Sequence, residues 1–192
     1  MNYDFYHSKI DEIHGFLCPG QERFLFDYIN NLPKSSLILE IGSHQGRSTI
    51  SMGFAAKNND SKIIAVDIFP EEESFNKFIK NIKDNELENT ISYFKERSDD
   101  FLKKWDSRFP KIEIDFVFID GSHDYQDVLS DFILVYPFVR VGGYISFHDV
   151  IETWPGSYYA WHNFAKKVLS NHDNSNSLFV GKKVEQNLYF EF

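Results

Sequence analysis

The stretch LILEIGSHQGRST, residues 37–49, decides the fold. It opens with a short run of branched apolar side chains, which is typical of a buried strand. Two glycines follow, Gly42 and Gly46, with G-x-x-x-G spacing, and helical periodicity then continues to Asn58. A strand, a glycine turn and a helix in this order predict the first unit of an α/β fold, with a ligand bound near the turn.

Strand-like runs and helix-like segments alternate along most of the chain. The expected strands are 37–41, 62–68, 90–94, 114–120 and 143–148, and the expected helices are 21–31, 47–58, 71–83, 99–105 and 125–136. In the helix over 125–136, Val128, Phe132 and Val135 share the face that covers the sheet, while Asp131 points elsewhere. This alternation is typical of βαβ units and predicts a doubly wound, mostly parallel sheet.

The rhythm changes after residue 148. An aromatic-rich helix is expected around 158–169, and the runs SLFVG and QNLYFEF that follow it predict a terminal β-hairpin. We therefore expect an α/β protein with a seven-stranded, mostly parallel sheet and an antiparallel C-terminal strand. A single domain over 1–192 is predicted: an N-terminal cap segment (1–36), a cofactor-binding core (37–150), and a substrate-side helix with the hairpin (151–192).

Composition excludes several classes of partner. The 192 residues carry 29 acidic and 20 basic side chains, a formal charge of −9, so most of the surface would repel a nucleic-acid backbone. No apolar run approaches the roughly 20 residues that cross a bilayer, and the N-terminus lacks the pattern of a targeting segment. The single cysteine, Cys18, excludes an intramolecular disulfide. We expect a soluble, cytoplasmic protein with no nucleic-acid or membrane partner, and leave homodimer formation open.

Acidic side chains stand at the ends of the first two predicted strands. In open α/β sheets ligands bind beyond the carboxyl ends of strands, and Asp67 follows Glu40 at about the interval of a ribose-binding acid. The glycine spacing matches neither the dinucleotide fingerprint nor the phosphate-binding loop. Two carboxylates at one pocket suit a nucleoside that carries a cationic tail. S-adenosylmethionine is therefore the expected cofactor.

A second group of polar residues ends the fourth and fifth predicted strands. Adjacent parallel strands finish side by side, so Asp120 and His123 should lie near His148 and Asp149. Methyl transfer to a hydroxyl needs either a general base or a divalent cation that lowers the pKa of that hydroxyl. His123 is the candidate base, with Asp120 as a second catalytic residue, and Asp120 and Asp149 are candidate cation ligands. The sequence leaves both devices open.

Four ordered motifs carry a resemblance to a known family. They are GFLCPGQERFL at 15–25, LEIGSHQGRST at 39–49, FIDGSHDY at 118–125 and VGGYISFHDV at 141–150. Together they resemble the small class I S-adenosylmethionine-dependent methyltransferases of the macrocin and sugar O-methyltransferase type. The resemblance implies a Rossmann-like methyltransferase fold and methylation of a hydroxyl on a sugar or small natural-product acceptor.

The resemblance also implies roles for individual residues. The methionine and ribose side of the cofactor is expected on Glu40, Gly42, Ser43, Gly46 and Ser48; the ribose hydroxyls on Asp67; and adenine between Ser98 and Asp99. Related enzymes hold Mg²⁺ with an acid after the fourth strand and an acidic pair after the fifth. Asp120 and Asp149 match this pattern, whereas His148 stands in place of an acid. If a metal is used, we expect Asp120, His148 and Asp149 to hold it. The metal is then Mg²⁺ or Mn²⁺, and the imidazole of His148 suits Mn²⁺ better than Mg²⁺.

Two alternatives stay open at this stage. The chain could be a catalytically inactive S-adenosylmethionine-binding partner subunit, which would bind the cofactor without turnover. The aromatic segment 154–162 follows the predicted active edge directly, and it is either a wall for the acceptor or a packing surface.

Overall fold

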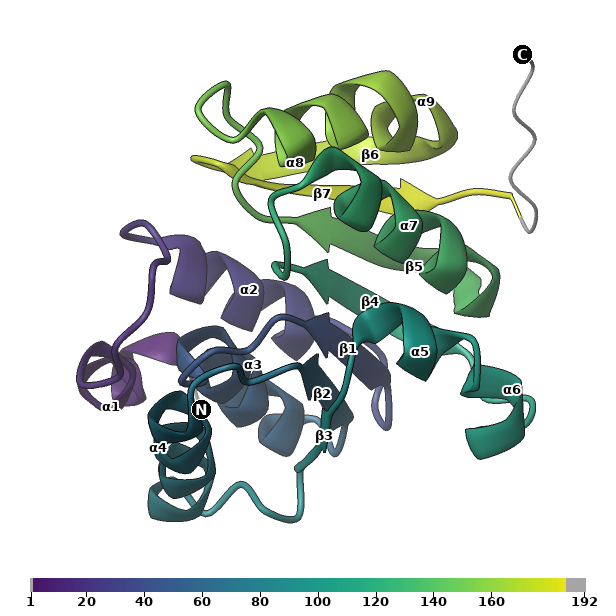
Figure 1. Cartoon of the computed structure of the whole chain (residues 1–192). Helices are drawn as coiled ribbons and strands as arrows, with labels where there is room; N and C mark the ends of the chain where they lie inside the picture. Colours follow the sequence, from purple (N-terminus) through teal and green to yellow (C-terminus); the bar gives the residue numbers. More distant parts are fainter. Residues whose placement is uncertain (1, 186–192) are drawn as a thin grey trace.

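A computed structural model describes residues 2–185, which form one seven-stranded sheet between two layers of helices (Figure 1). The strands are β1 (Leu37–Ile41), β2 (Lys62–Asp67), β3 (Ile91–Lys95), β4 (Ile114–Ile119), β5 (Val139–Phe147), β6 (Leu169–Ser175) and β7 (Leu178–Lys183). Their order across the sheet is β3-β2-β1-β4-β5-β7-β6. β1 to β5 pair in parallel, and β7 runs antiparallel to both of its neighbours. The predicted fold class is confirmed.

Helices cover both faces of this sheet. One layer contains α1 (His7–Asp11), α2 (Gln21–Asn30), α3 (Arg47–Asn58) and α4 (Glu72–Asp84), with the short helix η1 (Tyr3–Phe5) beside them. The other contains α5 (Ser98–Leu102), α6 (Trp105–Arg108), α7 (Tyr125–Val135), η2 (Tyr136–Phe138), α8 (Pro155–Ala160), η3 (Trp161–Ala165) and α9 (Lys166–Val168). No helix within residues 2–185 combines the length and the apolar character that a bilayer crossing requires.

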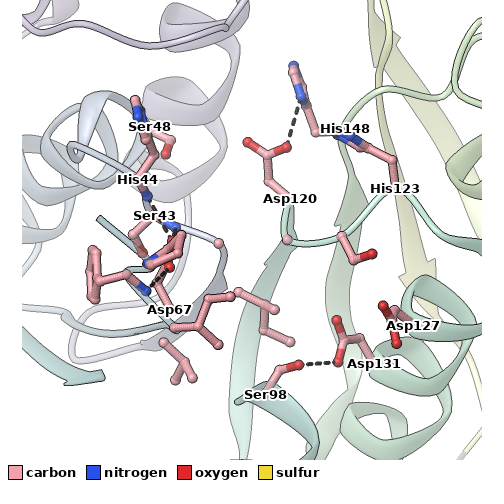
Figure 2. A pocket seen from close by; sticks show the side chains of 18 of the residues that line it. Ser43, His44, Ser48, Asp67, Ser98, Asp120, His123, Asp127, Asp131 and His148 are labelled. Carbon is pink, nitrogen blue, oxygen red and sulfur yellow. Dashed lines mark hydrogen bonds and ion pairs between the residues drawn. The ribbon is translucent and has the colours of Figure 1, made fainter. Parts of the chain in front are cut away.

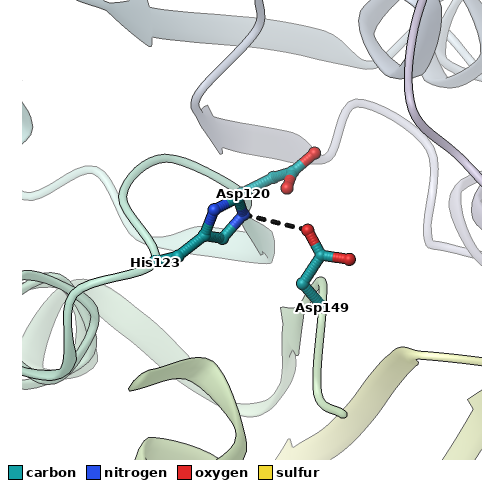
Figure 3. Close-up of side chains that lie close together, drawn as sticks. All are labelled: Asp120, His123 and Asp149. Atoms are coloured by element: carbon teal, nitrogen blue, oxygen red, sulfur yellow. Dashed lines mark ion pairs between the residues drawn. The ribbon is translucent and has the colours of Figure 1, made fainter. Parts of the chain in front are cut away.

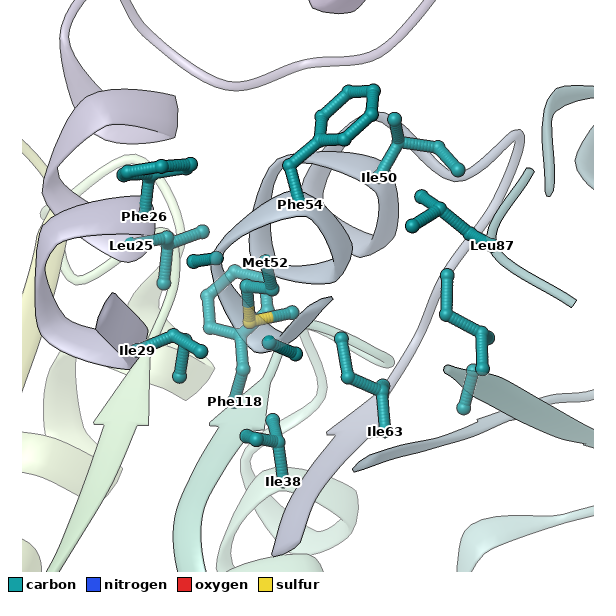
Figure 4. Packing of buried hydrophobic residues seen from close by; sticks show 14 of the residues in the cluster. Leu25, Phe26, Ile29, Ile38, Ile50, Met52, Phe54, Ile63, Leu87 and Phe118 are labelled. Carbon is teal, nitrogen blue, oxygen red and sulfur yellow. The ribbon is translucent and has the colours of Figure 1, made fainter. Parts of the chain in front are cut away.

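Successive residues of each central strand enter different cores. In β1, Ile38 packs in the core under α2 and α3, and Leu39 packs in the core on the opposite face. β2 divides Ile63 and Ile64 in the same way. Figure 4 shows the first of these cores, where Leu25, Ile29, Met52 and Phe54 from the helices meet Ile38, Ile63 and Phe118 from the strands. Because both faces are covered, the strands read as continuous apolar runs rather than alternating ones.

The C-terminal part differs from the prediction. A hairpin is present, but its strands are not the predicted pair. SLFVG contributes to the second strand, β7, and the first strand, β6, is the polar run over 169–175, for which no strand was predicted. β6 lies at the sheet edge with mostly exposed side chains, so hydrophobic periodicity could not reveal it. The run QNLYFEF lies outside the described residues. The predicted helix over 158–169 is three shorter pieces, α8, η3 and α9, joined through one π-helical turn.

The turn that begins α8 packs directly on the loop after β4. A Cβ atom at Gly156 would stand 1.9 Å from the carbonyl oxygen of His123 and 2.7 Å from the amide nitrogen of Tyr125. These neighbours are backbone atoms, which cannot turn aside as a flexible side chain can. The position therefore requires glycine, and the contact fixes the loop that carries His123.

Replacing Gly156 by Ala is expected to lower the free energy of unfolding by about 3 kcal/mol, because the added methyl group forces two backbone segments apart. Urea denaturation at pH 7 measures this loss. Gly20→Ala is the matched control, since Gly20 has a φ of +92° and a Cβ atom there would have no neighbour within 4 Å. It should lose about 1 kcal/mol for its left-handed backbone alone. Equal losses in the two variants would contradict the close contact.

Candidate functional site

A pocket of about 1030 Å³ opens at the carboxyl ends of the five parallel strands, β1 to β5. The loops after these strands line it, together with Gly15–Leu17 from the N-terminal segment. Its walls include ten of the predicted site residues: Gly42, Ser43, Ser48, Asp67, Ser98, Asp99, Asp120, His123, His148 and Asp149. Figure 2 shows the labelled polar side chains in three groups, around Asp67, around Asp120 and around Asp131. The volume is large enough for two small ligands side by side.

The glycine turn after β1 lies against the loop after β4. Gly42 has a φ of +86°, and a Cβ atom there would stand 2.1 Å from the carbonyl oxygen of Asp120. Only glycine adopts this positive φ without strain and leaves room for the neighbouring carbonyl group. The turn leads into α3, whose first two residues, Arg47 and Ser48, line the pocket. The N-terminus of a helix favours an anionic group. The sequence-predicted ligand loop and the residue Asp120 are therefore in direct contact.

Glu40 supports this loop from behind and does not line the pocket. Its carboxylate is fully buried and accepts hydrogen bonds from the hydroxyls of Ser43, Ser48 and Thr49. Burial raises the pKa of Glu40 to about 7, although the three hydroxyl hydrogen bonds favour the ionised form. Gly46 is likewise outside the lining, as the residue that precedes α3. The structure thus places Glu40 and Gly46 behind the pocket wall, and their predicted contact with a cofactor stays a prediction.

Asp67 holds the same loop from the side of β2. Its Oδ2 accepts hydrogen bonds from the backbone amides of Ser43 (2.7 Å) and His44 (2.9 Å). Its Oδ1 accepts one from the amide of Phe69 (2.6 Å). Because Oδ1 has a single partner, it retains the capacity to accept a hydrogen bond from a ligand in the pocket.

His148 is the centre of a buried polar network. Its Nδ1 lies 3.0 Å from Asp120 Oδ1 and 3.3 Å from Asp149 Oδ2, and its Nε2 lies 2.9 Å from Gln21 Oε1. The Gln21 amide is oriented by its other partners, since its Oε1 accepts from the amide of Cys18 and its Nε2 donates to the carbonyl of Ser175. Oε1 can therefore only accept from His148, and both ring nitrogens of His148 act as donors.

The electrostatics agree with this assignment. Burial alone lowers the pKa of His148, but the charges of Asp120 and Asp149 and their hydrogen bonds outweigh burial and raise that pKa to about 10. Burial raises the pKa of Asp149, and the hydrogen bonds from His148 and His123 more than offset it, so that this pKa is lowered. Burial raises the pKa of Asp120, and the charge and hydrogen bond of His148 oppose that rise. The raised pKa of His148 therefore favours a buried imidazolium beside Asp149 and Asp120.

His123 faces the pocket beside this network. Its Nε2 lies 2.9 Å from Asp149 Oδ2, and Figure 3 shows the two side chains meeting next to Asp120. Since an ionised carboxylate only accepts, the Nε2 atom carries a proton. Within residues 2–185 no hydrogen bond is formed by Nδ1, so this atom could accept a proton from a ligand in the pocket. The Trp154 indole lies against the His123 ring at a centroid distance of 4.1 Å and is 43% exposed. Trp154 thus contacts the candidate base directly, and it lines the pocket.

The possible ligands of a metal ion differ from those predicted. Within residues 2–185, one group of at least three candidate ligands is close enough to share an ion: Asp120, His123 and Asp149, with ligand atoms within 4.8 Å of one another. This group shares Asp120 and Asp149 with the predicted ligand set, and it contains His123 where the prediction has His148. Both nitrogens of His148 lie within hydrogen-bond distance of other side chains. Two carboxylates and one imidazole fit Mn²⁺ better than Mg²⁺.

The far end of the pocket holds an acid whose burial the helix pattern did not predict. Asp131 on α7 is only 4% exposed, and its Oδ1 accepts a hydrogen bond of 2.6 Å from the Ser98 hydroxyl. Burial raises the pKa of Asp131 to about 6, against the effect of that hydrogen bond. Asp99 also lines the pocket, but its carboxylate pairs with Lys103 (2.8 Å) and Arg97 (3.0 Å). These hydrogen bonds lower the pKa of Asp99 to about 2.

Arg47 connects the N-terminal segment to the site. As the first residue of α3 it donates to Glu22 Oε1 (2.7 Å), to the carbonyl of Ile13 (2.9 Å) and to Asp11 Oδ1 (3.0 Å). This holds the segment before α2 against the ligand loop, where part of it forms a pocket wall. Sequence reasoning missed Arg47, Gln21 and Asp131. A glutamine and an arginine inside otherwise apolar helical faces were the available signals for the first two.

Comparisons with known proteins place the chain in a family. The family described as "Methyltransferase domain" matches residues 39–150. "Uncharacterized protein R132" of Acanthamoeba polyphaga mimivirus is 34% identical over 130 residues, which is 62% of this chain and 54% of that protein. The chain therefore matches about half the length of this curated relative.

Solved structures share the fold. The O-methyltransferase TomG from Streptomyces achromogenes, solved in complex with SAM, has a TM-score of 0.71 at 16% identity, over 88% of this chain and 82% of that one. The MycE methyltransferase of the mycinamycin biosynthetic pathway, solved with Mg and SAH, has a TM-score of 0.64 at 18% identity, over 96% of this chain and 55% of that one.

Replacing Gln21 by Leu is expected to lower the free energy of unfolding by about 2–3 kcal/mol. The change leaves His148 Nε2 and the Cys18 amide without an acceptor, and buried unpaired donors are costly. Urea denaturation at pH 7 provides the measurement. Gln126→Leu, at an exposed position of α7, serves as the control and should change stability by less than about 0.5 kcal/mol. A Gln21→Leu protein as stable as the control would disprove this role of the Gln21 amide.

Glu40 should give the protein a distinct dependence on pH. Its pKa of about 7 lies above the value of about 4.3 for an unfolded Glu, so the folded state binds the proton more tightly. The stability that this carboxyl contributes is present below about pH 4 and is lost as the pH rises to 7.

We expect wild type to lose about 3 kcal/mol relative to Glu40→Gln between pH 4 and pH 8. Urea denaturation across that range measures the difference. Glu12→Gln, at an exposed position, is the control and should show the wild-type slope. Parallel curves for wild type and Glu40→Gln would show that the pKa of Glu40 is the same in the folded and unfolded states.

Proposed function

We propose that this chain, which belongs to the methyltransferase-domain family, transfers the methyl group of S-adenosylmethionine to a hydroxyl of a sugar or other small natural-product acceptor. Family membership confirms the predicted methyltransferase, and the donor, acceptor and catalytic device are our proposal. One observation carries it: the glycine loop and the cluster of Asp120, His123 and Asp149 form adjoining walls of one pocket. A methyl donor on the first would face a base on the second.

The ligand loop offers groups that suit each part of the donor. The first amides of α3 favour the methionine carboxylate. The free accepting capacity of Asp67 Oδ1 suits a ribose hydroxyl. TomG and MycE were solved with SAM and SAH respectively, which supports the same donor for a chain of the same fold.

The His123 cluster supplies the proton acceptor. In the proposed step the acceptor oxygen forms a bond to the methyl carbon while the carbon–sulfur bond breaks, and sulfur keeps the electron pair as a neutral thioether. The hydroxyl proton passes to His123 Nδ1, the ring nitrogen that is free of Asp149. Asp149 then stabilises the imidazolium through the hydrogen bond at Nε2.

A divalent cation is a second device that the same residues accommodate. Asp120, His123 and Asp149 would hold it, and MycE was solved with Mg. Bound there, the ion would lower the pKa of the acceptor hydroxyl. The imidazolium of His148 would remain beside the site and reduce its negative charge, which weakens the attraction for a cation.

Isothermal titration calorimetry with S-adenosylmethionine and its demethylated product tests the donor. Both should bind with one site per chain. Release of the demethylated product is then followed with a panel of sugars, nucleotide sugars and phenols, in the presence of Mn²⁺, Mg²⁺ or excess chelator. Full activity in chelator supports His123 as base, and activity that requires Mn²⁺ supports the cation.

His123→Gln is expected to reduce turnover by about 10²- to 10⁴-fold without weakening the affinity for the demethylated product. His7→Gln, at an exposed position on α1, is the matched control and should behave as wild type. Failure of wild type to bind either nucleoside overturns the proposed function. Tight binding without turnover on every acceptor would favour the inactive partner subunit.

A further inference from the structure

A buried carboxylate lies at the end of the pocket opposite the His123 cluster. Asp131 and Ser98 are drawn together there in Figure 2, away from Asp120 and His148. Both residues line the pocket. If sulfur faces Asp120 and ribose is held at Asp67, the base of the nucleoside extends toward this remaining end. The groups at this end therefore decide which base the protein accepts.

Asp131 has one oxygen free for a ligand. Oδ1 accepts the hydrogen bond from Ser98, whereas Oδ2 points toward the loop after β4, 4.0 Å from the position of a Cβ on Gly121. Gly121 carries no side chain and itself lines the pocket, so the space beside Oδ2 is open. Ile68 follows Asp67, is 55% exposed and lines the same region, where it offers an apolar surface for a flat ring.

Asp99, the acid expected beside adenine, is already occupied. Its Oδ1 pairs with Arg97 and its Oδ2 with Lys103, both on the solvent side of α5. A ligand would have to compete with two cations for this carboxylate. Within residues 2–185 no Lys, Arg or His forms an ion pair with Asp131, which is also the more deeply buried of the two acids.

We propose that Asp131 accepts a hydrogen bond from the exocyclic amino group of adenine, and thereby selects adenosyl over inosyl cofactors. This inference rests on the proposed function, because it assumes that the pocket binds a nucleoside. Adenine carries an amino group at C6, which donates to Oδ2, and hypoxanthine carries a carbonyl oxygen there, which would face the same acceptor without a hydrogen. A carboxylate distinguishes the two bases by one charge-assisted hydrogen bond.

Calorimetric titration of the full chain with S-adenosylhomocysteine and S-inosylhomocysteine tests the proposal. Wild type should bind the adenosyl compound about 10- to 100-fold more tightly, as expected for a hydrogen bond to a charged group. Asp131→Asn presents an amide hydrogen to the base in place of an acceptor, so the preference should fall below about 3-fold or reverse. Asp100→Asn removes the same charge at an exposed position of α5 that does not line the pocket, and it should keep the wild-type ratio.

The outcomes separate the two levels of inference. Wild type that binds both compounds with equal affinity overturns the role of Asp131, whether or not the Asp131→Asn variant folds. An unchanged ratio in folded Asp131→Asn, verified by its urea denaturation curve, overturns it as well. A structural role limited to the Ser98 hydrogen bond would weaken both compounds equally. If wild type binds neither compound, the proposed function fails and this inference fails with it.

Discussion

The backbone hydrogen bonds of the parallel sheet continue one residue beyond its central strands, and the site depends on this continuation. Gly42 N donates to the carbonyl of Val66, Asp120 N to that of Ile41, and His148 N to that of Ile119. Three of the loops that line the pocket therefore leave the sheet at the same level. The contact of Gly42 with the Asp120 carbonyl then closes the gap between two of them. Glu40 and Asp67 hold the glycine loop from behind and from the side, so that its backbone is fixed before any ligand arrives.

The buried imidazolium extends this constraint to distant parts of the chain. Gln21 is the first residue of α2, so its hydrogen bond with His148 connects the cluster to that helix. Its hydrogen bonds to Ser175 and Ser177 connect the cluster to the β6–β7 hairpin. The N-terminal segment is joined to the site a second time through Arg47. Every member of such a network has to be paired, because an unpaired group in this environment costs more than its hydrogen bond contributes. The cap segment and the hairpin are therefore parts of the site's framework, although few of their residues face the pocket.

Local signals were sufficient for much of this arrangement. The limits of β1 and α3 follow from the run LILEI and from Gly46, and strand order places Asp120 and Asp149 at one edge. Contacts between side chains that lie far apart in the sequence could not be predicted from such local signals. His148 ends the expected strand, yet only its contact with Gln21, far away in the sequence, shows that Nε2 is occupied. The burial of Asp131 could not be predicted for another reason. Helical periodicity identifies only the apolar face of α7, whereas Asp131 lies on the flank of that helix and is covered by Ser98 from a different helix. β6 was missed because an exposed edge strand needs no apolar side chains.

The charge of the buried cluster fits the proposed reaction. Asp120 and Asp149 with the imidazolium of His148 sum to one negative charge, which a sulfonium donor in the same pocket would balance. Methyl transfer removes the charge of the sulfonium and places a proton on His123, whose imidazolium is then paired with Asp149. In the proposed step the positive charge thus moves from the donor to the cluster, and the summed charge of donor and cluster stays unchanged. With an acid in place of His148 the cluster would carry three negative charges, which a divalent cation could compensate. The His148 imidazolium supplies positive charge that a cation would otherwise bring, and for this reason we propose a proton acceptor ahead of a divalent cation as the catalytic device.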